Sequence, residues 1–307
     1  MKLPDDKGHV RETAVRLLAT SVDEVERVPS FAGNRVFKAT TAVGEFFLKF
    51  AEVDPTAAEH AVLCIAAELG IPVPTIAGVD LDGTVTGCPC LAMRAVPGRP
   101  LNGDEALFAG VGPLLERLHD LRVQGFGSIS PTIGGGVRGE DRTWFETLQR
   151  RTDAGRVVVE AGLVPGTLID AVASAVEERP WESFEDSRLL HGDFHPRHVY
   201  ADLDRITAII DWGDATAGDP DYDIARILHS VILRSDLSTA LAVASNGLPR
   251  ERRDIDDQRL AKLLTYAAVF IVWSMHGEYE SGSLWPAWWS IQTDALERVV
   301  DALAATR

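Results

Sequence analysis

The chain has 307 residues, of which 46% are hydrophobic, and its formal net charge is −16. This length and composition are sufficient for a substantial core and for two lobes of ordinary domain size. The negative charge argues against a nucleic-acid partner, and the three cysteines form neither a disulfide framework nor paired Cys-x-x-Cys sites. The first residues do not resemble a signal peptide, so a cytoplasmic location is expected.

The first elements are strands and one helix. Two apolar runs flank Pro29–Phe37, which predicts two strands joined by a turn, and the turn lacks the G-x-G-x-x-G pattern. Phe46–Phe50 is predicted to be a strand that carries one cation, Lys49. A buried ammonium is costly unless an anion pairs with it, and a phosphate or a carboxylate would serve.

A helix from about Thr56 to Leu69 supplies the candidate carboxylate. Its apolar residues recur at helical spacing, and Glu59 lies on this helix, although Glu52 is a nearby alternative. The apolar residues of this stripe are Ala58, Ala61, Val62, Ile65 and Leu69.

A domain boundary is expected after the next strand. In Cys90–Gly98 an apolar run ends in a Pro-Gly step, which divides the chain into a small lobe, 1–97, and a large lobe, 98–307. Gly134–Gly136 follows no expected strand and precedes no apolar helix. We therefore predict a flexible loop there, and not a phosphate cradle.

Two carboxylates carry the expected chemistry. Asp193 and Asp211 lie 18 residues apart, and Val199–Tyr200 and Ile206–Ile210 read as strands around the turn 202–205 between them. Phosphoryl transfer requires the acceptor hydroxyl to be oriented, the nucleotide phosphates held and their charge neutralised by Mg²⁺. One carboxylate placed at the hydroxyl and one at the metal would divide that work.

Three motifs in this region resemble the aminoglycoside phosphotransferase family. They are His191–Asp193, Ile210–Trp212 and Gly218–Ala225, and the run Arg205–Trp212 is especially similar to hygromycin B phosphotransferases. The resemblance implies an α+β, bilobal fold like that of the protein kinases. Its small N-terminal lobe has an antiparallel sheet and one helix, and its larger C-terminal lobe is mainly helical.

The resemblance also implies roles for individual residues. Asp193 would be the catalytic base and Asp211 a Mg²⁺ ligand, and Lys49 and Glu59 would be the pair that grips the phosphates of ATP, with GTP as an alternative nucleotide. Asp219 and Asp223 would brace the catalytic loop, with a helix N-cap as the alternative for one of them. The remaining nucleotide-binding positions would be Ser30 in the turn over the nucleotide and Arg94 and Val96 at the hinge.

His198 departs from the family pattern. Five residues after the catalytic Asp the family usually has Asn, whereas imidazole suits softer metals than Mg²⁺. His198 would then act on the second metal position through a bound water, accept Mn²⁺, or indicate that one metal suffices. An alternative is a zinc-type cluster of Asp193 with His191, His195 and His198.

The C-terminal region is expected to bind the acceptor. Leu263–Met275, at 13 residues, is too short to span a bilayer and is predicted to be a buried helix. Beyond it, Glu278 and Glu280 would bind a protonated amino sugar, together with nearby tryptophans, although aromatic residues in a helical hairpin more often pack in the core. The acidic net charge fits a cationic acceptor, and it fits ordinary solubility as well. The tryptophans are Trp273, Trp285, Trp288 and Trp289.

These observations together predict an ATP- and Mg²⁺-dependent O-phosphotransferase for a small hydroxyl compound, with no nucleic-acid or membrane partner. An aminoglycoside of the hygromycin type is the first choice of acceptor. The alternatives are a kinase for a macrolide or a metabolic amino alcohol, and a nucleotide-binding regulatory protein without catalysis. The sequence does not predict the oligomeric state.

Overall fold

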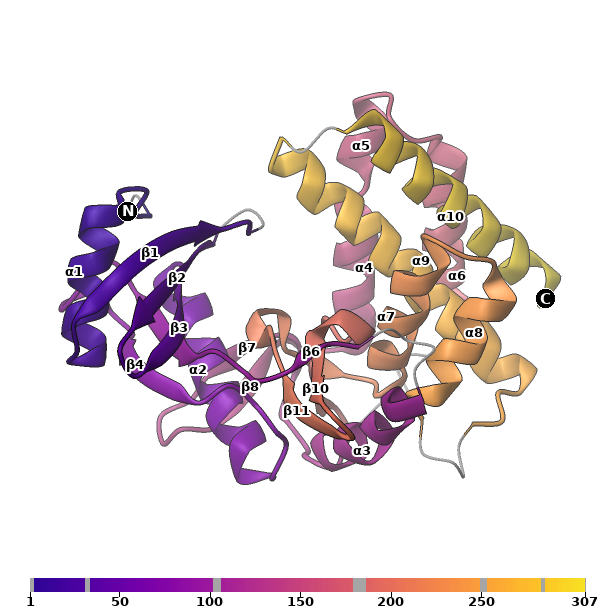
Figure 1. Cartoon of the computed structure of the whole chain (residues 1–307). Helices are drawn as coiled ribbons and strands as arrows, with labels where there is room; N and C mark the ends of the chain where they lie inside the picture. The colour runs from indigo at the N-terminus through magenta and orange to yellow at the C-terminus, as the bar shows by residue number, and fades with distance from the viewer. Residues whose placement is uncertain are drawn as a thin grey trace. The chain divides into compact units, whose positions relative to one another are not determined.

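The computed structural model describes residues 3–30, 34–101, 106–178, 186–248, 253–282 and 285–306. The fold is α+β with antiparallel sheets, as predicted (Figure 1). The chain forms two compact units. The first unit comprises Met1–Arg99, Ser130–Val137 and Tyr200–Gly213, and the second comprises Pro100–Ile129, Arg138–Val199 and Asp214–Arg307. Two later segments of the chain thus group with the first unit.

A five-stranded antiparallel sheet forms the centre of the first unit, in the order β1-β2-β3-β5-β4. The turn expected between the first two strands joins β1 to β2, and Phe31–Gly33 of that turn lie outside the described residues. The strands are β1 (Val22–Val28), β2 (Arg35–Thr41), β3 (Gly44–Phe50), β4 (Ile76–Asp80) and β5 (Cys90–Arg94).

The described residues of the first unit include two α-helices. α2 (Val53–Glu68) begins three residues before the predicted start, and α1 (Lys7–Leu18) is additional to the one helix expected. Asp6 caps α1, because its carboxylate accepts hydrogen bonds from the backbone N–H groups of Gly8 and His9.

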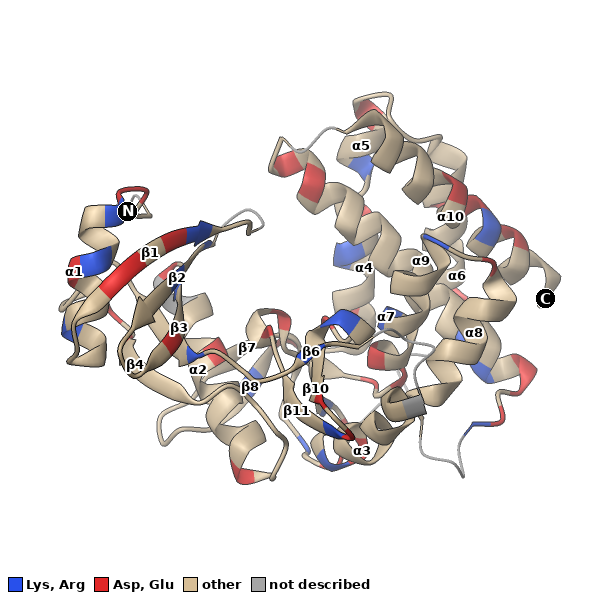
Figure 2. Ribbon diagram, viewed as in Figure 1, with Lys and Arg blue, Asp and Glu red and all other residues tan. Residues whose placement is uncertain are grey.

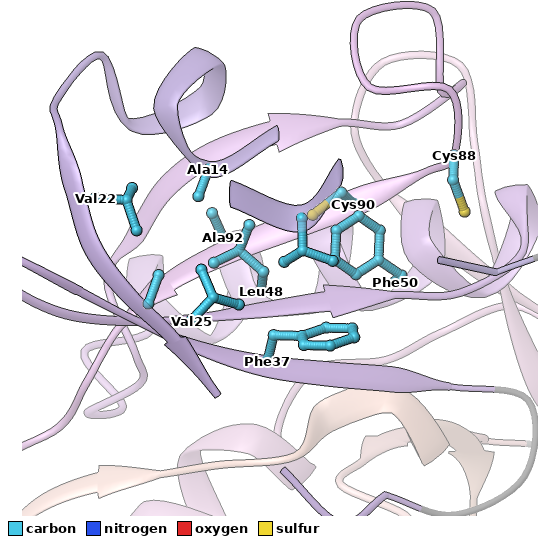
Figure 3. Close-up of a cluster of buried hydrophobic side chains, with 11 residues drawn as sticks. Ala14, Val22, Val25, Phe37, Leu48, Phe50, Cys88, Cys90 and Ala92 are labelled. Atoms are coloured by element: carbon cyan, nitrogen blue, oxygen red, sulfur yellow. The ribbon is translucent and has the colours of Figure 1, made fainter. Parts of the chain in front are cut away.

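Apolar side chains from α1 and the strands fill one core (Figure 3). Phe37 of β2 and Phe50 of β3 meet edge to face with their ring centroids 6.0 Å apart, and both are fully buried. This core holds β3, and therefore Lys49, against the neighbouring strands.

A second sheet has the order β11-β10-β6. β10 (Val199–Asp202) and β11 (Arg205–Ile209) form the predicted hairpin, and β6 is Arg99–Pro100. At the preceding Pro-Gly step Gly98 has φ +94°, and a Cβ there would lie 2.0 Å from the carbonyl oxygen of Ala201. Only glycine fits this close approach of two backbones.

The second unit is mainly helical and contains a four-stranded sheet in the order β8-β7-β12-β9. Its strands are β7 (Phe126–Pro131), β8 (Val137–Asp141), β9 (Arg188–Leu190) and β12 (Thr216–Gly218). Its described helices are α3 (Gly112–His119), α4 (Trp144–Ala154), α5 (Arg156–Glu160), α6 (Gly166–Glu177), α7 (Asp221–Ile232), α8 (Leu237–Asn246), α9 (Asp257–Glu280) and α10 (Pro286–Ala305), with short 3-10 turns η1 (Ala106–Val111) and η3 (Pro196–His198). A further 3-10 turn, η4 (Trp212–Asp214), lies at the boundary that follows Gly213.

The expectation that Gly134–Gly136 follows no strand was wrong. These glycines connect β7 to β8, and the strand was missed because Gly127, Ser128 and Pro131 weaken its pattern. Gly134 and Gly135 have φ of +104° and +86°, with nothing within 4 Å of a Cβ at either position. They therefore form an open hairpin loop.

The predicted buried helix over Leu263–Met275 is confirmed as the middle of α9. This helix of 24 residues is long and apolar enough to cross a membrane. However, 67% of its most apolar 18-residue stretch is buried inside the protein. That degree of burial is typical of a core helix, and α9 packs beside α7, α4 and α10.

Candidate active site

Lys49 lies at the centre of the polar cluster in the first unit. Its Nζ is 2.9 Å from Oε2 of Glu59 and 3.0 Å from Oδ1 of Asp211. Burial alone would lower the pKa of Lys49, but the two carboxylates raise it above its ordinary value. The structure thus brings together three of the residues selected from the sequence, and the lysine stays charged.

Asp211 has an unusual backbone conformation. It follows β11 with φ +63°, in the left-handed region that residues other than glycine seldom adopt. Such strain persists where the surroundings impose it, often at functional sites. Two residues later, a Cβ at Gly213 would lie 2.8 Å from Nζ of Lys49. Gly213 therefore leaves room for the ammonium, and the sequence analysis did not select it.

The other proposed nucleotide-binding residues do not join this cluster. Arg94 pairs with Phe46 in the sheet, whereas Lys49 pairs with Leu91. The guanidinium of Arg94 donates to the carbonyl oxygen of Val43 and lies over the ring of Phe46. The other two proposed nucleotide-binding residues are Val96 and Ser30. Val96 is half-buried and follows β5, and the hydroxyl of Ser30 donates to the carbonyl oxygen of Asn34.

A buried carboxylate braces the loop that carries Asp193 in the second unit. Asp223 of α7 accepts hydrogen bonds from the backbone N–H groups of His191, at 3.0 Å, and Gly192, at 2.9 Å. Nε2 of His119 lies 2.9 Å from the same carboxylate. Gly192 has φ +80°, and a Cβ there would lie 1.8 Å from the carbonyl oxygen of Asp214. The loop conformation is therefore fixed by one carboxylate and one glycine.

His191 serves the same loop. Its side chain is fully buried, and its Nδ1 accepts a hydrogen bond from the backbone N–H of Asp193 at 3.3 Å. This contact fits the positioning role expected from the sequence.

The hydrogen bonds and the ion pair of the Asp219 carboxylate lead to α7 and α9. Its Oδ1 accepts from the backbone N–H of Asp221, and its Oδ2 accepts from the hydroxyl of Tyr266 and pairs with Lys262. It therefore ties the start of α7 to α9, close to the helix-start role that was the alternative.

The carboxylate of Asp193 has a partner that the sequence analysis missed. Nε and Nη2 of Arg226 each lie 2.6 Å from Oδ1 of Asp193. Arg226 follows Asp223 by three residues on α7, so the two side chains lie on one face of the helix. That spacing was the available signal.

His198 and His195 flank Asp193. Nδ1 of His198 donates to the carbonyl oxygen of Asp193 at 2.9 Å, and it lies 3.5 Å from Oδ2. The ring centroids of the two histidines are 3.7 Å apart. Burial, followed by the neighbouring positive groups, lowers the pKa of His195, which keeps its imidazole neutral.

Asp193, His195 and His198 place ligand atoms within 4.8 Å of one another, as a metal site requires. However, Arg226 already holds Oδ1 of Asp193, and Nδ1 of His195 already accepts from the backbone N–H of Arg197 at 3.2 Å. These hydrogen bonds use one possible ligand atom of Asp193 and one of His195, so a zinc-type site would have to form through the other atom of each. Asp211 offers a half-exposed carboxylate, which is the ligand type that Mg²⁺ prefers.

The two acidic residues expected at the acceptor site have different surroundings. Glu278 is buried, and its two oxygens accept from Nε1 of Trp288 at 2.6 Å and from Nε2 of Gln292 at 2.9 Å. This placement favours a packing role between α9 and α10. Glu280 is exposed, and so are Trp273 and Trp285, whereas Trp289 is buried.

Comparison with known proteins identifies the family. Residues 24–255, more than half of the chain, match the phosphotransferase enzyme family. The chain belongs to this family.

Two curated relatives match part of the chain. It is 28% identical over 171 residues to hygromycin-B 4-O-kinase of Escherichia coli, a match that covers 52% of this chain and 48% of that protein. It is 25% identical over 183 residues to acyl-CoA dehydrogenase family member 10 of Mus musculus, covering 54% of this chain and 16% of that protein. The matched part thus spans about half of the first relative and far less of the second.

Solved structures of other proteins show the same fold. A thermostable mutant of aminoglycoside phosphotransferase APH(4)-Ia in its apo form has a TM-score of 0.73 at 18% identity, covering 95% of this chain and 98% of that one. A putative fructosamine-3-kinase from Haemophilus somnus has a TM-score of 0.64 at 16% identity, covering 94% and 96%. At these identities the likeness establishes the fold alone.

The brace formed by Asp223 yields a test of stability. In Asp223→Asn the amide nitrogen would face backbone donors, so we expect the free energy of unfolding to fall by about 3–5 kcal/mol at neutral pH. Burial raises the pKa of Asp223. The opposing effect of His119 and of the backbone N–H of Gly192 is larger, so the pKa lies below its ordinary value. The carboxylate therefore stabilises the fold above the unfolded-state pKa of about 3.9, and this stabilisation is lost as the pH falls through the lower folded-state pKa.

Urea unfolding followed across pH checks this expectation. The difference between the native protein and Asp223→Asn should be full at pH 7 and should shrink in acid, below about pH 4. Asp204→Asn, in the exposed turn of the β10–β11 hairpin, is the control and should change stability by less than about 0.5 kcal/mol. Equal urea midpoints for Asp223→Asn and the native protein would contradict the brace.

Proposed function

We propose that the chain is an ATP- and Mg²⁺-dependent O-phosphotransferase that acts on a hydroxyl of a small molecule. The observation that carries the proposal is the cluster of Lys49, Glu59 and Asp211, because a buried ammonium between two carboxylates matches the need to hold charged phosphates. Membership of the phosphotransferase enzyme family supports it independently.

In this proposal the first unit holds the nucleotide. Lys49 binds the phosphates, and Glu59 fixes the ammonium through their buried ion pair, 2.9 Å in length. ATP is favoured, with GTP as the alternative, since related crystal structures hold AMP-PNP or ADP. Ser30, Arg94 and Val96 stay proposed as peripheral contacts to the nucleotide.

Asp211 would hold Mg²⁺ in this proposal, since its carboxylate suits a hard cation. The bound ion would neutralise the charge of the phosphates. His198 would act on the second metal position through Nε2, because its Nδ1 donates to the carbonyl oxygen of Asp193. An imidazole there favours Mn²⁺ or a bridging water.

Asp193 is the proposed base. Its loop is fixed by Asp223 and Gly192, so its carboxylate is presented in one orientation to the acceptor hydroxyl. A carboxylate in this position would accept the hydroxyl proton as the phosphoryl group is transferred.

An aminoglycoside of the hygromycin type is the first proposed acceptor. The match to hygromycin-B 4-O-kinase supports it, and so do the related crystal structures that contain hygromycin B. Glu280 is exposed on α9 and could pair with an ammonium, whereas both oxygens of Glu278 are occupied by Trp288 and Gln292. A second candidate is a kinase for another small hydroxyl compound, favoured by the structural likeness to putative fructosamine-3-kinases.

Nucleotide binding can be tested through Lys49. Lys49→Met leaves Glu59 and Asp211 without their shared cation, so we expect the affinity for AMP-PNP in the presence of Mg²⁺ to fall by at least about 10-fold. Titration calorimetry measures it. Lys38→Met is the matched control, because Lys38 also lies in a strand of the same sheet and pairs with Glu45 at 3.2 Å, but at the exposed surface. Unchanged affinity in Lys49→Met would contradict the role of Lys49.

The reaction itself can be tested with a panel of aminoglycosides, macrolides, glycated amines and amino alcohols. We expect one class to stimulate ADP formation with Mg²⁺, and Asp193→Asn to lower that stimulated rate by on the order of 100-fold or more, because the base is lost. Mn²⁺ is included as a second condition because of His198. Tight nucleotide binding without turnover in either metal would instead favour a regulatory protein.

A further inference from the structure

One face of α7 binds both the backbone of the catalytic loop and the side chain of Asp193. Asp223, Arg226 and His229 follow one another at intervals of three residues, and this spacing places them along one side of the helix. Asp223 accepts hydrogen bonds from the backbone N–H groups of the two residues that precede Asp193 in the sequence. Arg226 binds the carboxylate of Asp193 itself. The third residue, His229, contacts Arg226.

The guanidinium of Arg226 is fixed from behind. Its Nη1 donates to Nδ1 of His229 at 2.9 Å, and its Cζ lies 5.7 Å from the ring centroid of Phe270. His229 is buried and stacks against Phe270, and its Nε2 has no hydrogen-bond partner among the described residues. Burial and the charge of Arg226 lower the pKa of His229, so its imidazole stays neutral and its Nδ1 remains an acceptor.

This arrangement makes the two carboxylate oxygens of Asp193 unequal. Nε and Nη2 of Arg226 both lie 2.6 Å from Oδ1. No hydrogen bond to Oδ2 occurs in the described part of the chain, and Nδ1 of His198 lies 3.5 Å from it. A fork of two donors on a single oxygen restrains rotation of the carboxylate and leaves the other oxygen for the acceptor.

We propose that Arg226 is a positioning residue, supported by His229, that holds Asp193 through Oδ1 so that Oδ2 receives the proton of the acceptor hydroxyl. This inference rests on the proposed phosphotransferase function and adds a residue to it. Arg226 acts through Asp193 and need not touch the acceptor.

The first test is Arg226→Ala, assayed with the acceptor that the panel identifies. We expect kcat to fall on the order of 10- to 100-fold, since a misplaced base loses rate, while the KM for ATP changes by less than about 3-fold. Added guanidinium should restore part of kcat, because it can occupy the space left by the side chain. Arg226→Lys should have an intermediate kcat, since an ammonium keeps the charge but lacks the planar fork.

The second test is a double-mutant cycle. If Arg226 acts through Asp193, then Arg226→Ala should add no further loss, within about 2-fold, once Asp193→Asn is present. Arg259→Ala is the matched control. Arg259 also pairs with an aspartate of α7, with Nη2 2.6 Å from Oδ1 of Asp221, and it is similarly buried. This control should lower the melting temperature and show no gain of kcat with guanidinium.

Three results would overturn the inference while the native protein remains active. The first is a kcat of Arg226→Ala within about 2-fold of the native value. The second is a double mutant in which the losses of kcat caused by Arg226→Ala and Asp193→Asn multiply. The third is a loss of kcat that follows the loss of melting temperature in both Arg226→Ala and Arg259→Ala and that guanidinium does not reverse. If Arg226→Ala does not fold, Arg226→Lys and Arg226→Gln take its place under the same criteria. A native protein that transfers phosphate to no acceptor would instead refute the proposed function.

Discussion

The buried carboxylate of Asp223 is the interaction on which the catalytic loop depends. Removing a charge from water is costly, and the cost is offset here by hydrogen bonds to two backbone N–H groups and to His119. If these bonds were lost, the backbone before Asp193 would lose its main anchor, although Arg226 would still pair with the carboxylate of Asp193. The same helix must therefore be held firmly for the loop to be fixed.

α7 is anchored by a second polar network at its first turn. Asp219 and Asp221 both pair with Lys262 of α9, and Arg259 of α9 also pairs with Asp221. The hydroxyl of Tyr266 donates to Asp219 and accepts from Nε1 of Trp144 on α4. Buried polar networks in which every member has a partner favour one arrangement of their helices. The position of α7, and hence of Asp223 and Arg226, follows from these contacts.

The acidic net charge does not identify the acceptor. Figure 2 shows acidic residues spread over elements of both units, including β1 and α10. Beside Asp193 the contacting charge is positive, because Arg226 pairs with its carboxylate. The composition therefore reflects the whole surface, and the charges near the base must be considered separately.

Much of the architecture was predictable from local patterns. The strand that carries Lys49, the β10–β11 hairpin and the buried α9 follow from apolar periodicity and turn residues. The cost of burying Lys49 predicted an anionic partner, and Glu59 is one. Its second partner, Asp211, is 162 residues away, and no local pattern predicts such a pairing. Arg226 was missed for a similar reason, because its spacing from Asp223 is informative only once Asp223 is known to face the loop.

The measurement that tests the central claim most directly follows the phosphoryl group itself. ATP labelled in its γ-phosphoryl group is incubated with the protein and the stimulating acceptor, and the label is traced. The account predicts that the label is recovered in a phosphate ester of the acceptor, and that almost none is recovered there with Asp193→Asn. Label found only in inorganic phosphate, or equal transfer by Asp193→Asn, would contradict it.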